Sequence, residues 1–218
     1  MKAKQVMIWS LILTGAVVVL GLLLSPRFPE NMAIHWNELG EADGYGSSFM
    51  GVWFLPLVTL GLTLLLLGIP QIDPLKKNIE KFRSEYNLFI LLFVIFFVYL
   101  QVITLLFNLG WQFNLLALLV PAFGGFFYYI GIMLEKAKRN YFIGIRTPWT
   151  LANEDVWNET HRVGAKGFKI GGVLTLLGVV FPDYAIWIMM VPLLLVSIFT
   201  VVYSYFVFRK LQPEINGN

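Results

Sequence analysis

The chain has 218 residues, of which 58% are hydrophobic and only 13% are charged, about half the charged fraction of an ordinary soluble domain. This composition indicates an integral membrane protein, and the absence of cysteine excludes disulfides and thiolate metal sites. The net charge of +3 does not by itself indicate a nucleic-acid partner, because in a membrane protein the placement of the charges matters more than their sum.

The first apolar run covers residues 5–26 and follows Lys2 and Lys4. It superficially resembles a secretory signal peptide, but it is about as long as a full bilayer span. The sequence SPRF at 25–28 offers no small-x-small cleavage site. We therefore predict a retained first transmembrane helix.

A first polar cluster, IHWNELGEADGYG at 34–46, lies in the loop at 25–49. Its three glycines allow tight turns with positive φ, and its His, Asn, Glu and Asp side chains are able to coordinate a cation or hold a peptide. One histidine among scattered carboxylates is a weak metal pattern, so we assign no metal and no cofactor. A compact turn that caps the helix ends and a contact surface for a partner both remain open.

Four further uncharged stretches predict the remaining spans. One occupies 44–72, and the window 86–134 is long enough for two helices separated by the turn sequence NLGWQFN at 108–114. The next uncharged window, 170–182, is short, so we extend this fifth helix back to about Gly164, with Lys166 and Lys169 reaching the interface. A sixth span occupies 184–208. The predicted fold class is an all-α, polytopic membrane helix bundle of about six transmembrane helices.

The distribution of basic residues predicts the orientation of the bundle. If the N-terminus is cytoplasmic, 15 of the 16 Lys and Arg residues fall inside and only Arg27 falls outside, a strong positive-inside bias. Both termini are then cytoplasmic, and the external loop at 25–49 is acidic. No charged side chain lies within the predicted cores, which disfavours ion-coupled transport.

Small residues recur at helical spacing within the predicted spans. The pairs Gly61/Gly68 and Gly167/Gly171 would each allow a neighbouring helix to approach closely. We interpret both pairs as packing positions.

A second polar cluster occupies residues 140–162 on the predicted cytoplasmic side. Pro148 disfavours helical angles at the residue before it, so we expect 140–151 to be extended. Asn153 is suited to cap a helix that begins with two acidic residues. Because Trp157 and His161 are four residues apart, they share one helix face, and we expect an amphipathic helix on the inner membrane surface that ends near Gly164.

Two interpretations remain open for the charged members of this cluster. Arg146 is either a positive-inside anchor or a specific contact, and His161 is either a hydrogen-bonded structural residue or a ligand or base. A hydrolytic site is poorly supported, because only threonine hydroxyls are near as nucleophiles. The Asn158-Glu159-Thr160 sequon is treated as chance, since it falls inside.

Together the two clusters resemble a known family. The segment NYFIGIRTPWTLANEDVWNETHRVGAKGF closely resembles the C-terminal signature of the SdpI family of bacterial membrane proteins. The segment HWNELGEADGY resembles the domain of unknown function that often precedes that signature. Both motifs occur in the expected order, separated by helices.

The resemblance implies a multi-pass protein of the cell membrane with two units, 1–84 with the external loop and 85–218 with the cytoplasmic segment. The founding member of the family is an immunity protein that protects a cell from a secreted peptide toxin and sequesters a transcriptional repressor at the membrane. The implied contact residues outside are His35, Trp36, Asn37, Gly40 and Asp43. Those inside are Arg146, Thr147, Pro148, Trp149, Thr150, Trp157, Thr160 and His161.

Three functions follow from this reading of the sequence. The first is an immunity or signalling protein, not an enzyme, whose partners are membrane lipids, a peptide toxin outside and a winged-helix repressor inside, with no direct contact to nucleic acid. The second is a membrane enzyme or small-solute carrier with a cytoplasmic site around Arg146 and His161. The third is a purely structural membrane factor. A deep pocket that converges on Arg146 and His161 would favour the second, and a flat surface would favour partner binding.

Overall fold

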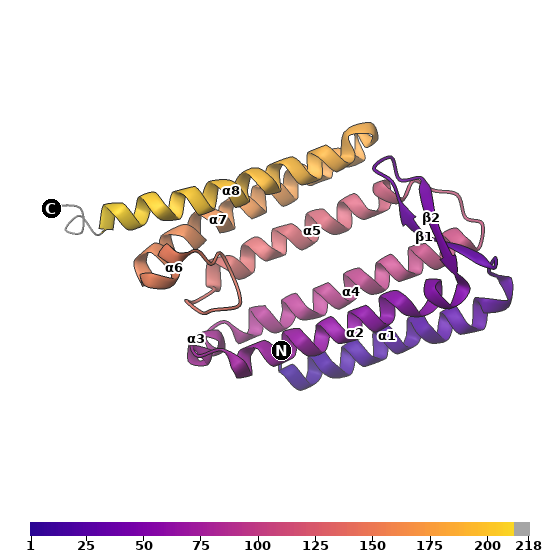
Figure 1. Cartoon of the computed structure of the whole chain (residues 1–218), viewed down its shortest axis with the longest axis horizontal. Helices are drawn as coiled ribbons and strands as arrows, with labels where there is room; N and C mark the ends of the chain where they lie inside the picture. The colour runs from indigo at the N-terminus through magenta and orange to yellow at the C-terminus, as the bar shows by residue number, and fades with distance from the viewer. Residues whose placement is uncertain (212–218) are drawn as a thin grey trace.

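The computed structural model describes residues 1–211, which form helices and one small hairpin (Figure 1). The elements are, in order, α1 (Ala3–Leu24), η1 (Ser25–Arg27), β1 (Asn31–Trp36), β2 (Ala42–Ser47), α2 (Ser48–Ile72), α3 (Lys76–Glu80), α4 (Arg83–Asn108), α5 (Leu115–Lys136), α6 (Pro148–Ala152), α7 (Glu154–Thr175), η2 (Leu176–Val179), η3 (Pro182–Tyr184) and α8 (Ala185–Leu211). The prediction of an all-α polytopic bundle is confirmed.

Among residues 1–211, five helices are long and apolar enough to cross a membrane, namely α1, α2, α4, α5 and α8. Their outward faces carry exposed apolar side chains, such as Leu195 and Ile198 on α8, which suits contact with lipid. The predicted sixth span falls on the C-terminal part of α7 and on η2. This segment is not among the five candidate spans, because it belongs to α7, a single helix whose first half is polar and charged.

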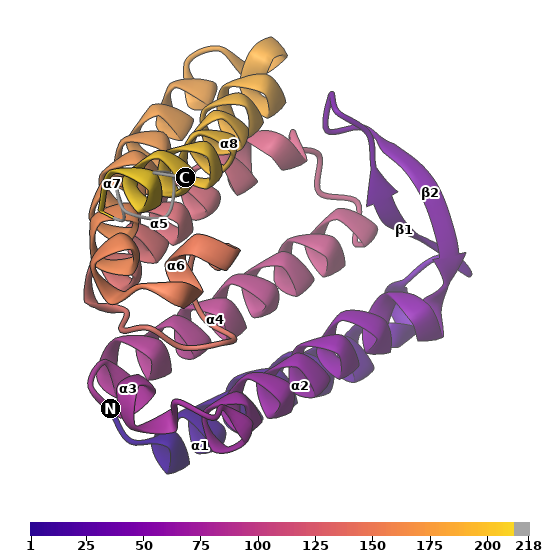
Figure 2. The same cartoon turned by 60° about the vertical axis from the view of Figure 1, so that its left-hand side comes forward.

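The long helices pack in two groups that meet where α4 contacts α5. One group contains α1, α2 and α4, and the other contains α5, α7 and α8; Figure 2 shows the two groups diverging from that contact. α5 and α7 approach closely because Gly124 and Gly172 face each other, and a methyl group on Gly172 would lie 2.7 Å from the Gly124 carbonyl oxygen. Small residues thus bring the second group together, as in other membrane bundles.

Three local predictions need correction. Residues 148–152 are helical instead of extended, because Pro148 occupies the first turn of α6, where its fixed φ is favourable. The chain also does not break at Gly164: α7 continues from Glu154 to Thr175 and packs between α5 and α8, so its polar first half does not lie flat on a membrane. Of the two predicted glycine pairs, Gly61 and Gly68 face open space, and Gly167 and Gly171, which meet α8, serve helix packing.

The two polar clusters lie at opposite ends of the bundle. The β1–β2 hairpin lies at one end, and α3, α6 and the start of α1 lie at the other (Figure 1). We call these the hairpin end and the α6 end. The segments that carry most of the lysines and arginines gather at the α6 end, which matches the charge segregation used to predict topology.

Candidate functional site

The outer cluster folds as an antiparallel hairpin instead of a simple turn. Its strands pair with Met32 opposite Gly46 and Ala33 opposite Tyr45, and the register is irregular around His35. The connecting turn is closed by Asn37, whose Oδ1 accepts hydrogen bonds from the backbone N–H groups of Leu39 and Glu41, each at 3.0 Å. Local side-chain bonds of this kind are characteristic of Asn in turns.

Gly40 completes that turn with a φ of +78°, which favours glycine. A side chain at this position would also meet Asn114 at the start of α5, at 2.7 Å from its Oδ1. Asn114 caps α5 and donates from Nδ2 to the Leu39 carbonyl at 3.1 Å. The turn therefore depends on a residue distant in sequence.

The hairpin is also anchored to α4. Asn108 accepts a hydrogen bond from the Ala33 N–H at 2.7 Å and donates to the Ala33 carbonyl at 3.0 Å. The Trp36 ring packs edge to face on Phe107, with ring centroids 5.4 Å apart. These contacts fix β1 over the end of α4, and β2 leads directly into α2.

His35 and Asp43 form an ion-pair geometry on the outer surface of the hairpin. His35 Nδ1 lies 2.6 Å from Asp43 Oδ1, while the two side chains remain 70% and 43% exposed. This pair is presented to solvent together with the exposed side chains of Glu38, Glu41 and Tyr45. Within residues 1–211 there is no group of three or more His, Asp or Glu side chains that could hold a metal ion.

In the inner cluster, the two threonines of the RTPWT motif cap α6. Thr147 Oγ1 accepts from the Thr150 N–H at 3.1 Å, and Thr150 Oγ1 accepts from the Thr147 N–H at 2.9 Å. This reciprocal arrangement satisfies the free donors at the start of a helix. Thr147 also bonds to Ser204 of α8 at 3.0 Å. Both threonines are buried, so their hydroxyls serve the fold.

Trp157 and His161 stack on one face of α7, as their spacing predicts, with ring centroids 4.0 Å apart. Asn153 caps this helix as expected, because its Oδ1 accepts from the N–H groups of Asp155 and Val156. Trp157 is fully buried and donates from Nε1 to the Ala137 carbonyl at 3.0 Å. Gly144 lies against both rings with a φ of +114°, so no side chain fits there.

Both nitrogens of His161 are occupied by backbone groups. Nε2 accepts from the Ile145 N–H at 3.0 Å, so Nδ1 carries the proton and donates to the Trp157 carbonyl at 2.8 Å. The ring is 2% exposed, and burial lowers its pKa to about 4. His161 is therefore neutral at physiological pH and holds the loop before α6 against α7.

The remaining inner residues lie at different depths. Arg146 is exposed and donates to the Tyr141 carbonyl at 2.9 Å, and Pro148 is also exposed. Trp149 is half-buried and packs edge to face on Tyr205 of α8. Thr160 is buried, and its hydroxyl has no hydrogen-bond partner among residues 1–211.

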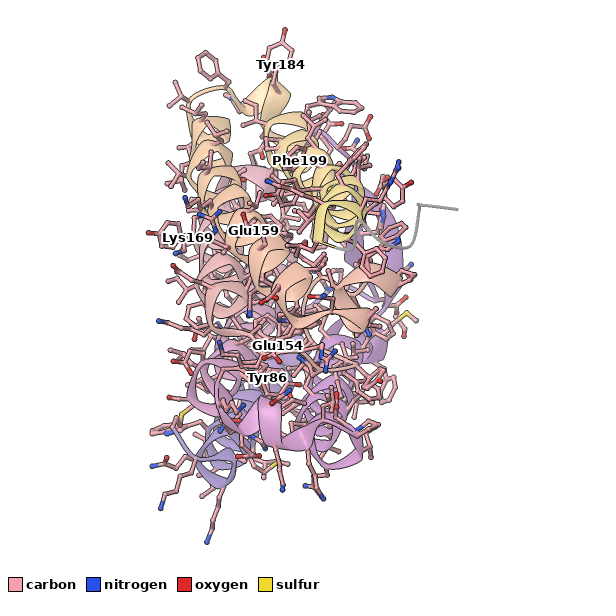
Figure 3. The ribbon with its side chains drawn as sticks, turned by 90° about the vertical axis from the view of Figure 1, so that its left-hand side faces the viewer. Tyr86, Glu154, Glu159, Lys169, Tyr184 and Phe199 are labelled. Carbon is pink, nitrogen blue, oxygen red and sulfur yellow. The ribbon has the colours of Figure 1, made fainter. Side chains whose placement is uncertain are left out.

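The aromatic and basic residues of the inner cluster do not pack together as one group. Trp157 and His161 stack on each other, whereas Trp149 packs against α8 and Arg146 bonds to the loop before it. Figure 3 views this end of the molecule, with Glu154, Glu159 and Lys169 of α7 labelled.

Lys169 was expected only to reach the membrane interface, but it also forms an ion pair. Its Nζ lies 2.6 Å from Glu135 Oε2 and joins α7 to α5.

The sequence reading missed two buried polar residues that build the inner site. Asn140 donates to the carbonyls of Lys138 and Ile143 and accepts from the N–H groups of Phe142 and Ile143. Asp73, just after α2, accepts from the Leu75 N–H at 2.6 Å and from the Tyr141 N–H at 2.9 Å. Asn140 lies within the motif and was detectable as a turn residue. Asp73 had no such signal, because its partner Tyr141 is 68 positions away.

Comparison with known proteins agrees with this division into two clusters. The model of the SdpI/YfhL protein family matches residues 136–204, which include the inner cluster from Asn140 to Arg162, and a domain of unknown function (DUF1648) matches residues 12–60, which include the hairpin. Immunity protein SdpI of Bacillus subtilis (strain 168) is 30% identical over 206 residues, which cover 93% of this chain and 96% of that protein. No solved structure matches significantly. The chain is thus a multi-pass protein of the cell membrane and belongs to the SdpI/YfhL family.

Proposed function

We propose that this chain is a membrane immunity protein that protects its cell from a secreted peptide toxin, and that the toxin is met at the hairpin end. The similarity to an immunity protein along almost the whole chain supports the general class. The acidic loop at 25–49, with four carboxylates against one arginine, supports attraction of a cationic peptide from outside.

The observation that carries the proposal is the exposed His35–Asp43 pair. Its two side chains face solvent, so they are free to exchange their mutual contact for one with a peptide. In the inner cluster, by contrast, the polar groups of Thr147, Thr150 and His161 are already bonded within the protein. We accordingly assign toxin contact to the unit 1–84 and structural support and signalling to the unit 85–218.

For the inner face, we propose contact with a cytoplasmic protein of the winged-helix repressor type. The exposed Arg146 and Pro148, with the half-buried Trp149 beside them, supply a cationic and aromatic surface of the kind enriched at protein interfaces. Binding of a repressor there would link toxin outside to gene expression inside.

The alternative of an enzyme or small-solute carrier around Arg146 and His161 gains no support from the geometry. A general base needs a free nitrogen within reach of a substrate, whereas both His161 nitrogens bond the backbone and the ring is buried. Arg146 is exposed and donates to the Tyr141 carbonyl, whereas His161 is buried and bonds to the backbone of α7 and of the loop before α6.

Survival of sensitive cells that express the chain tests this proposal. His35→Ala and Asp43→Ala, at matched membrane levels, are expected to lower the protective potency about tenfold, as for loss of one charged hydrogen bond. Asp183→Ala is the matched control, because it removes an exposed acid outside the hairpin. Arg146→Ala should retain protection and lose only signalling. If the hairpin variants protect like wild type while Arg146→Ala fails, capture at the hairpin is wrong.

A further inference from the structure

A cavity of about 480 Å³ lies beneath the hairpin, between β1 and the outer turns of α2 and α4. Its volume falls within the range of small-ligand sites, roughly 300–1,000 Å³. Most of its wall is apolar, and His35 lies among the residues that line it. The principal apolar lining residues are Ile34, Trp36, Phe54, Leu55, Leu100 and Leu115.

One buried polar atom of a lining residue has no partner among residues 1–211, namely the indole Nε1 of Trp36. A second unpaired atom, Oε1 of Gln101, belongs to a residue that does not line the cavity but follows the lining residue Leu100 in the sequence. The Gln101 amide donates from Nε2 to the carbonyl of Gly51, another lining residue, at 2.8 Å. Buried polar atoms in folded proteins are nearly always paired, so the free donor of Trp36 suits a ligand that brings a hydrogen-bond acceptor into the cavity.

We propose that this cavity receives a large apolar side chain of a cationic peptide, whose backbone carbonyl accepts a hydrogen bond from Trp36 Nε1. This inference rests on the proposed function and specifies how the toxin is held. The cavity supplies an apolar anchor point, and the exposed His35–Asp43 pair at its edge supplies polar contacts. A central apolar anchor with polar contacts around it is the usual arrangement of a protein interface.

Charge favours a cationic peptide over a lipid as the occupant. The surrounding loop contains Glu30, Glu38, Glu41 and Asp43 against Arg27 alone. Such a surface attracts a positively charged peptide and repels the headgroup of an anionic lipid. A lipid chain in the same cavity is therefore the competing outcome of the test.

The test uses the full chain in lipid nanodiscs, with a single cysteine introduced as Met50→Cys at the cavity wall. The probes are two synthetic Lys/Gly peptides of equal length and charge, one with a Trp-Leu pair and one with Ala-Ala at the same positions. The Trp-Leu peptide should slow maleimide labelling of Cys at position 50, and the Ala-Ala peptide should need at least about tenfold higher concentration, because it lacks the buried apolar side chains.

Two variants locate the effect within the cavity. Leu55→Trp fills the cavity, so the Trp-Leu peptide should no longer slow the labelling at position 50. Leu57→Trp lies on the exposed face of the same helix and should leave the effect of the peptide intact. Trp36→Phe keeps an aromatic ring but removes the N–H donor, so it should weaken the effect of the peptide on labelling without abolishing it. Normal labelling of a cysteine at Tyr45 in each variant verifies that the hairpin is folded.

Several results overturn the inference. The cavity does not hold an apolar side chain if both peptides slow the labelling equally, or if neither slows it. The same conclusion follows if the Trp-Leu peptide slows the labelling as strongly in Leu55→Trp. If lysophosphatidylglycerol slows the labelling as strongly as the Trp-Leu peptide does, the cavity is a lipid site instead. If the peptide binds but cells are not protected, the proposed immunity fails while the cavity assignment stands. If cells survive and the Leu55→Trp variant lets them survive equally well, the proposed immunity stands and the cavity assignment fails.

Discussion

The hairpin and the inner cluster contain similar kinds of residues but use them in opposite ways. At the α6 end, Thr147, Thr150 and His161 direct their polar atoms into the protein and bond to its backbone. At the hairpin end, His35 and Asp43 bond each other in full view of solvent. A dense polar motif in a membrane protein is therefore not in itself a binding site, because many of its polar groups can be hydrogen-bonded within the loop that they fold.

Reagent access distinguishes the two ends most sharply, because the outcome is all or none. In a chain without cysteine, Tyr45→Cys on the hairpin should react with a membrane-impermeant maleimide on intact cells. Ala152→Cys at the α6 end should react only after the cells are opened. Both positions are exposed. The opposite labelling pattern would invert the topology and remove the basis for meeting a toxin at the hairpin.

The largest effect on stability is expected at the buried end. Trp157→Ala removes a fully buried ring and its bond to Ala137, which should cost about 3–5 kcal/mol. Trp187→Ala is the matched control, because Trp187 is 64% exposed and its loss should change stability by no more than about 0.5 kcal/mol. Thermal unfolding in one detergent measures both. Equal shifts would mean that the inner cluster is not a packed core.

Acid should weaken the inner cluster through His161. Its pKa is about 4 in the folded protein against an ordinary value near 6.5, so the unfolded chain binds the additional proton between these values. Stability should then fall as pH decreases from about 6.5 to about 4, by about 3 kcal/mol in total. His161→Gln should lose this component of the pH dependence. A variant with the same slope as wild type would assign the acid sensitivity to carboxylates.

The smallest effect on stability is expected at the hairpin. The His35–Asp43 pair is exposed, and exposed ion pairs contribute about 0–1 kcal/mol. His35→Ala should therefore unfold within a few degrees of wild type, even though we expect it to lower the protective potency in the survival assay. Unfolding in the same detergent, together with the survival assay, separates the two effects. A large loss of stability would make the pair structural and would weaken the contrast between the two ends.

The long helices were predictable because uncharged windows of about twenty residues have few alternatives in a bilayer. The cap at Asn153 and the shared face of Trp157 and His161 were predictable because both depend on residues within four positions. The continuity of α7 past Gly164 was not, because it depends on glycines of α5 and α7 that let two helices pack closely. Helix packing prevailed over the local amphipathic pattern.

The hairpin was not predictable from its own sequence. Its second strand, ADGYGS, is rich in residues that are depleted in strands, and a two-stranded hairpin alone is only marginally stable. Asn108 and Asn114, from the helices that follow much later, supply the missing hydrogen bonds. The motif residues could be recognised, but the frame that holds them lies elsewhere in the chain.

Asn108 also protects the hairpin from unwanted partners. Because its side chain occupies both the N–H and the carbonyl of Ala33, these groups lie on the side of β1 that faces away from β2. The amide thus occupies the place of a third strand and closes this edge at its centre. Exposed strand edges are sites of association between chains, so this amide removes one donor and one acceptor to which an extended segment of another chain would bind.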